Sequence, residues 1–175
     1  MNQETSGNIK IKKNRFLVKI ILCILTVCTL LGSMLAAYIQ EEKRKEQLFM
    51  NQVYSKLRDS IDEIDYILEN GYGTSIQRAH YILYDIAEEL ENGYQFVDDS
   101  IPSVASIWFL DNASKINDSF NEQGILTTEG IYFLKQLNVE LKELKSNMDD
   151  EEKLNLREMS IEDFSIIIKN FYYDE

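Results

Sequence analysis

The residue types that could perform catalysis or hold a metal ion are scarce in this sequence. His80 is the only histidine, and Cys23 and Cys28 are the only cysteines. A di-iron helical bundle needs a Glu-x-x-His pair on each of two helices, so a single histidine excludes that chemistry. A zinc site would have to combine His80 with carboxylates, because both cysteines lie inside an apolar segment. We therefore expect no metal ion and no other cofactor.

The amino-acid composition would allow nucleophilic catalysis, but no sequence motif supports it. Serine and aspartate are plentiful, so a Ser-His-Asp arrangement around His80 could be assembled. The sequence contains no GxSxG nucleophile elbow, no Walker loop and no dinucleotide fingerprint. His80 adjoins the apolar seam of a predicted helix, and a packed or half-exposed histidine is the simpler interpretation. We predict that the protein is not an enzyme and has no catalytic residues.

One apolar segment organises the rest of the chain. Residues 20–39 form a run of 20 amino acids without a charge or a proline. As a helix this run is about 30 Å long, which matches the hydrocarbon thickness of a bilayer. A cleaved signal peptide has a shorter apolar run and small residues before its cleavage site, whereas Met34 and Leu35 are large. We predict an uncleaved transmembrane signal-anchor over residues 16–39, with cleavage after Ala37 as the alternative.

Charge predicts how this helix is oriented and which partners the chain avoids. Five basic residues precede the apolar run, and only Lys43, Arg44 and Lys45 follow it closely, among glutamates. This bias favours a cytoplasmic N-terminus. Residues 41–175 carry 13 basic and 29 acidic residues, a net charge of −16. Such a domain is repelled by nucleic acid, so we expect the bilayer as a partner and no nucleic acid.

These observations divide the chain into three predicted parts at the cell membrane. Residues 1–15 form a basic cytoplasmic tail, residues 16–39 the membrane helix, and residues 40–175 an acidic extracytoplasmic domain. Within the membrane helix, Gly32 and Ala36 have the small-xxx-small spacing that allows close helix approach. A homodimer through these residues is one interpretation, although small residues are common in membrane helices generally.

The acidic domain has the periodicity of helices. Apolar residues recur at steps of three or four over several segments, and no segment alternates as a strand would. The links between the segments are short, which favours antiparallel neighbours. We predict an all-α fold, in which the membrane helix is followed by an antiparallel bundle of four or five helices. The seams run through Met50, Val53, Leu57, Ile61, Ile64 and Leu68; Ile76, Ala79, Leu83, Ile86 and Leu90; and Leu134, Leu137, Leu141, Leu144 and Met148.

Local signals mark several helix ends. The words LENG at 68–71 and 90–93 each end in a glycine that suits a left-handed C-cap. Thr127 and Ser160 are predicted N-caps, and Asp163 completes a capping-box variant with Ser160. The run 107–110 is apolar on every side, so its helix is predicted to be the most buried, with Trp108 in the core.

The C-terminal helix has more large apolar residues than a chain end usually exposes. We predict that it contacts a partner, unless it docks on its own bundle, which is the alternative. The residues of this candidate partner contact are Phe164, Ile168, Phe171, Tyr172 and Tyr173.

A family resemblance suggests what the partner is. The basic start, the single membrane helix and the phrase Gly124-Ile-Leu-Thr-Thr-Glu before a leucine seam resemble spore-germination accessory proteins that partner cortex-lytic hydrolases. The excess of isoleucine over alanine is typical of an AT-rich bacterial genome. We therefore expect a non-enzymatic, membrane-anchored interaction or accessory protein that holds a protein partner at the outer membrane face. The alternatives are a ligand-sensing extracytoplasmic bundle and, after it, an unrecognised hydrolase that uses His80.

Overall fold

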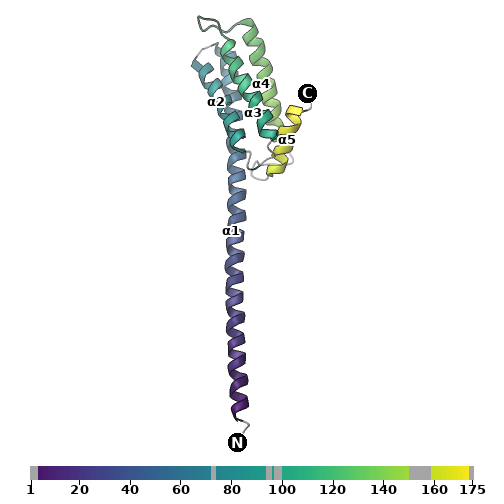
Figure 1. The fold of residues 1–175 in the computed structure, drawn as a ribbon. Coiled ribbons are helices and arrows are strands. Elements are labelled where there is room, and N and C mark those ends of the chain that lie inside the picture. The colour runs from purple at the N-terminus through teal and green to yellow at the C-terminus, as the bar shows by residue number, and fades with distance from the viewer. Residues whose placement is uncertain (1–3, 72–73, 94–95, 97–99, 150–158, 174–175) are drawn as a thin grey trace. The chain divides into compact units, whose positions relative to one another are not determined.

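The protein is mostly α-helical in the part of the chain that a computed structural model describes, which comprises residues 4–71, 74–93, 96, 100–149 and 159–173 (Figure 1). An isolated antiparallel bridge joins Phe120 and Leu126, and the described residues contain no strand. The predicted all-α class is confirmed. The helices are α1 (Glu4–Asn70), α2 (Thr74–Asn92), α3 (Ser100–Asp118), α4 (Thr128–Met148) and α5 (Ile161–Tyr173).

The chain divides into two units, residues 1–44 and residues 45–175, and α1 contributes to both. In the first unit, every side chain from Leu17 to Gln40 is exposed. An 18-residue window of α1 has a mean hydropathy of 2.5, and α1 is the one helix among the described residues that is long and apolar enough to cross a membrane. The hydroxyls of Thr26 and Ser33 donate to the backbone carbonyl oxygens of Leu22 and Leu30, each at 2.8 Å. Such bonds satisfy polar side chains in an apolar medium.

The second unit has one hydrophobic core, to which all five helices contribute. Leucine and isoleucine seams supply most of it, as their spacing of three or four residues predicts. Burial of these side chains is the main force that holds the helices together. The largest fully buried side chains are Phe109, Phe164, Met50, Leu57, Ile64, Ile67, Leu83, Ile86, Leu90, Ile116, Leu134 and Leu137.

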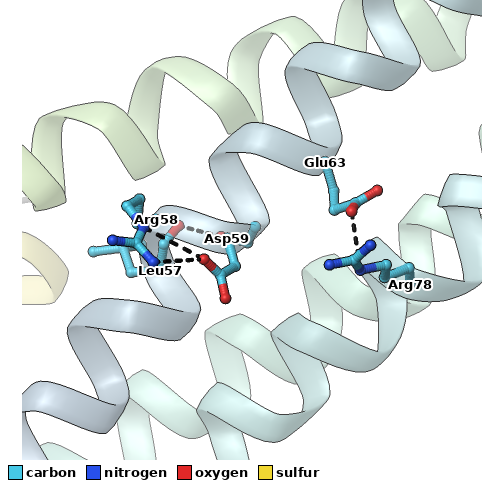
Figure 2. Close-up of polar contacts among 6 residues, drawn as sticks. Leu57, Arg58, Asp59, Glu63 and Arg78 are labelled. Atoms are coloured by element: carbon cyan, nitrogen blue, oxygen red, sulfur yellow. Dashed lines mark hydrogen bonds and ion pairs between the residues drawn. The ribbon is translucent and has the colours of Figure 1, made fainter.

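Ion pairs beside the core show that α1 and α2 run in opposite directions. The Lys56 ammonium lies 2.9 Å from the Glu89 carboxylate, and the Glu63 carboxylate lies 2.9 Å from the Arg78 guanidinium. Figure 2 shows the second pair linking the two helices. As residue numbers rise along α1, the numbers of their partners fall along α2. This is the signature of antiparallel packing.

Polar contacts between the other neighbouring helices follow the same rule. On α1, Asp65 accepts hydrogen bonds from Asn138 at 2.5 Å and Lys142 at 2.9 Å, both on α4. Tyr54, which precedes Asp65 on α1, donates at 2.5 Å to Asp149 after the end of α4. Between α2 and α3, the paired positions are 80 with 113 and 91 with 106. The second unit is therefore an antiparallel bundle, as predicted.

The helix ends follow the predicted chemistry at three positions and differ at a fourth. Thr127 is the N-cap of α4, and its hydroxyl accepts a hydrogen bond from the Gly130 amide. The Ser160 hydroxyl accepts from the Asp163 amide and donates to the Asp163 carboxylate. Gly71 has the left-handed φ of 69° that was expected after α1, whereas Gly93 has no positive φ. Gly93 is needed for a different reason, because the Phe49 ring occupies the space that a Cβ would fill.

The four apolar residues 107–110 lie on α3, the helix that was predicted to be the most buried, and they differ in exposure. Phe109 is buried, but Ile107 is 65% exposed and Trp108 is half-buried. Phe109 faces the interior of the bundle, while Ile107 and Trp108 line a pocket beside α5. Four consecutive apolar residues cover a whole turn of helix, but the bundle buries only part of that turn.

Candidate functional site

The C-terminal helix α5 packs its apolar face against the bundle. Phe164 and Ile168 are each only 1% exposed and belong to the core. The Phe164 ring meets the Phe49 ring edge-on, with centroids 5.5 Å apart. Phe164 and Ile168 were predicted to contact a partner, with docking on the protein's own bundle as the alternative. The structure shows the alternative for these two residues. The Tyr173 side chain lies outside the described part of the chain.

A pocket of about 640 Å³ opens between α3, α4 and α5. This is a volume typical of sites that take small organic ligands. Three aromatic rings line it, one from α3 and two from α5. Its lining residues are Val104, Ile107, Trp108, Asp111, Glu140, Glu143, Asn147, Asn170, Phe171 and Tyr172.

The aromatic rings form a connected cluster beside the pocket. The centroid of the Trp108 ring lies 5.9 Å from that of Phe171 and 5.5 Å from that of Tyr172. Phe171 and Tyr172 also meet edge-on, with centroids 4.9 Å apart. Edge-on contacts of this kind hold aromatic rings in defined orientations. The predicted contact residues Phe171 and Tyr172 are thus half-buried pocket residues. Trp108, which was predicted to lie in the core, is half-buried and packs against the core.

The charged side chains that line the pocket are all acidic among the described residues. Asp111 is already paired with Lys115 at 2.5 Å, which offsets its charge. Glu140 accepts a hydrogen bond from Gln136 at 3.0 Å and remains unneutralised. Glu143 has no basic partner among the described residues. The pocket therefore presents uncompensated negative charge on α4 next to the aromatic cluster.

The Tyr172 hydroxyl is the one polar atom of the pocket that is buried without a hydrogen-bond partner in the described chain. Although the Tyr172 side chain as a whole is half-buried, its hydroxyl oxygen is inaccessible to solvent. Burial, and then the negative charge of Glu140, raise the pKa of this hydroxyl well above its usual value. It therefore stays protonated at neutral pH. A buried hydroxyl that lacks a partner costs stability.

His80 occupies a structural position. The imidazole is half-buried, and its Nδ1 donates to the backbone carbonyl oxygen of Ala113 at 2.8 Å. Its ring also meets Tyr81 edge-on, with centroids 5.5 Å apart. The described contacts of His80 include no serine hydroxyl and no carboxylate. Nor do the described residues bring three or more histidine, cysteine, aspartate or glutamate side chains together as a metal site.

A second polar cluster joins α1 to the end of α4. The Tyr54 hydroxyl and the Lys145 ammonium both donate to the Asp149 carboxylate, and the Lys145 ammonium lies over the Tyr54 ring. Burial acts to raise the pKa of Asp149, but the hydrogen bonds from Lys145 and Tyr54 outweigh it and lower the pKa. We interpret this cluster as a structural link between α1 and the end of α4.

Comparison with known proteins identifies no relative of this chain. No family model, no curated protein and no solved structure matches the chain.

Proposed function

We propose that the protein is a single-pass membrane protein whose N-terminus lies in the cytoplasm and whose residues 40–175 lie outside. The observation that carries this proposal is the exposure of every side chain from Leu17 to Ile39, in a segment without an acidic residue. A continuous apolar surface of this length is unfavourable in water and favourable in lipid. The basic residues before the segment support the orientation.

We further propose that the bundle works by binding and not by catalysis, as an accessory protein that holds a protein partner at the membrane surface. Support comes from large side chains that the bundle leaves exposed, which include Tyr132, Tyr81 and Ile166. Aromatic residues are enriched where proteins bind one another. The resemblance to spore-germination accessory proteins makes a hydrolase of the cell envelope the expected partner. On this proposal, a homodimer through Gly32 and Ala36 would double the number of binding surfaces.

Site-specific cross-linking from native membranes tests this proposal. A photoreactive phenylalanine analogue replaces Ile166, which is exposed on α5. The matched control carries the same analogue at Glu122, in the exposed turn between α3 and α4. We expect a discrete adduct with one protein from position 166 and none from position 122. Identical patterns from the two positions, or no adduct from any exposed bundle position, would contradict partner holding.

Ligand sensing by the bundle is a second candidate function, and one observation favours it. The pocket between α3, α4 and α5 has the size and the mixed aromatic and polar lining of a small-molecule site. Partner holding does not require such a pocket. The two functions are compatible, because the exposed face of α5 and the pocket use different side chains.

A further inference from the structure

We propose that the pocket between α3, α4 and α5 binds a small alkylammonium ligand, with its alkyl part against Trp108 and Phe171 and its nitrogen beside Glu140. This inference goes beyond partner holding and names the ligand class of the sensing alternative. It would be a site for a free organic cation. The reasons are the sign of the charge in the pocket and its aromatic faces.

The charge of the pocket selects a cation over an anion or a neutral molecule. Glu140 and Glu143 lie one helical turn apart on α4, so both carboxylates approach the same side of the pocket. Glu140 is half-buried, where a charge interacts more strongly with a ligand than it would in water. The domain around the pocket carries a net charge of −16, with 13 basic and 29 acidic residues in 41–175. That field attracts cations toward the pocket and repels anions.

The aromatic cluster selects an organic cation over an inorganic one. Trp108, Phe171 and Tyr172 present ring surface to the pocket, and an aromatic face attracts an ammonium group through its quadrupole. The same rings offer apolar surface to an alkyl chain. A divalent metal ion would instead need several oxygen ligands grouped around one point. The described residues bring no such group together.

The carboxylates favour an ammonium that retains an N–H bond. Glu140 and Glu143 line the pocket, and each can accept a charge-assisted hydrogen bond. An ammonium N–H can donate to such a carboxylate, while a quaternary ammonium cannot. We therefore expect primary amines to bind more tightly than quaternary ones.

Trp108 makes the proposal directly measurable. It is the only tryptophan of the chain and it lines the pocket, so intrinsic tryptophan fluorescence reports on this site alone. The full-length protein in maltoside micelles is titrated with n-butylammonium chloride, tetramethylammonium chloride, n-butanol and sodium butyrate. We expect a saturable change with n-butylammonium, a weaker one with tetramethylammonium, and no saturable change with butanol or butyrate. A response that is equal for the amine and the alcohol would overturn the proposal.

Substitutions separate the contributing groups. The double variant Glu140→Gln, Glu143→Gln should bind n-butylammonium about tenfold more weakly or worse, because charged hydrogen bonds are lost. Glu122→Gln, which removes one negative charge from the distant turn, should leave the affinity unchanged. Circular dichroism establishes that each variant is folded, and equal affinity of the folded double variant would refute the proposal.

Titrations in lipid vesicles test whether the ligand of the pocket is a free amine or the amine of a lipid headgroup. The titration is repeated in two sets of vesicles with equal phosphatidylglycerol content, in which the remaining lipid is phosphatidylcholine in the first set and phosphatidylethanolamine in the second. A free ligand gives the same n-butylammonium affinity in both, as we expect. Weaker apparent binding in the second set would show that the lipid amine occupies the pocket, and would overturn the free-ligand proposal. These readouts are independent of the cross-linked adduct, so the pocket and partner holding can fail separately.

Discussion

Two stretches of the same helix, α1, place similar apolar residues in opposite surroundings. Between Leu17 and Ile39 every side chain is exposed, whereas Met50, Leu57 and Ile64 are 0% exposed. The first stretch is apolar on every side, and the second is apolar along one seam with charged residues opposite. Apolar residues all round a helix need an apolar medium, while a seam needs only neighbouring helices. The pattern of apolar residues along the helix, more than their number, thus indicates what surrounds each stretch.

The largest expected effect is a loss of stability that depends on which stretch of α1 is changed, and one pair of variants tests it. Leu57→Ala removes a fully buried side chain from the bundle and should lower the free energy of unfolding by about 2–5 kcal/mol. Leu30→Ala makes the same chemical change in the exposed stretch and should leave the stability of the bundle unchanged. Denaturant unfolding in micelles, followed by the fluorescence of Trp108, measures both. Equal losses from the two variants would show that the comparison is wrong.

A smaller effect is expected at the C-terminal end of α1. Gly71 has a φ of 69°, in the left-handed region that residues with a Cβ adopt at a cost. No atom lies within 4 Å of the position that a Cβ would take, so the cost of Gly71→Ala is conformational only. We expect a loss of about 1 kcal/mol in the free energy of unfolding. Gly32→Ala in the exposed stretch, which also has open space around it, is the matched control and should not change bundle stability.

The smallest effect concerns pH and the polar link between α1 and α4. The folded pKa of Asp149 is lowered, since the hydrogen bonds from Lys145 and Tyr54 outweigh the effect of burial. Its contribution to stability is therefore present at neutral pH and is lost as the pH falls below the ordinary aspartate value of about 3.9. The melting temperature of Asp149→Asn should lie slightly below that of the unsubstituted protein at pH 7. The gap should narrow at pH 3, and a gap that widens there would contradict the assigned link.

The sequence was sufficient to predict the helices but not the pocket. Periodicity identifies the face of each helix that is buried, and capping chemistry identifies where α4 and α5 begin, at Thr127 and Ser160. Neither signal shows which neighbour covers a given face. Trp108 therefore looked like a core residue, although α5 leaves it at the edge of a pocket. The lining residues are brought together from three helices only by packing, and no local motif joins them.

The role of Gly93 was also not predicted, because the sequence does not show which side chain packs against this glycine. A glycine at a helix end usually adopts a left-handed conformation, and sequence alone favours that interpretation. Here it permits the approach of the Phe49 ring from another helix.

The position of α5 was also left open by the sequence, because its apolar residues were consistent with either an interface or a core. Phe164 and Ile168 lie in the core, so deleting α5 would destabilise the bundle and could not test partner binding by itself.

The most direct test of the central claim uses the two native cysteines as reporters. Cys23 and Cys28 are free and lie in the apolar stretch, and residues 41–175 contain no cysteine. Ser114→Cys adds one thiol at an exposed position on α3. Intact cells are treated with a membrane-impermeant maleimide, and the mass of the purified protein is then measured. The account predicts labelling of the new cysteine alone, with Cys23 and Cys28 reacting only after detergent denaturation. Labelling of the native cysteines in intact cells, or protection of the new one, would contradict a membrane helix with an external bundle.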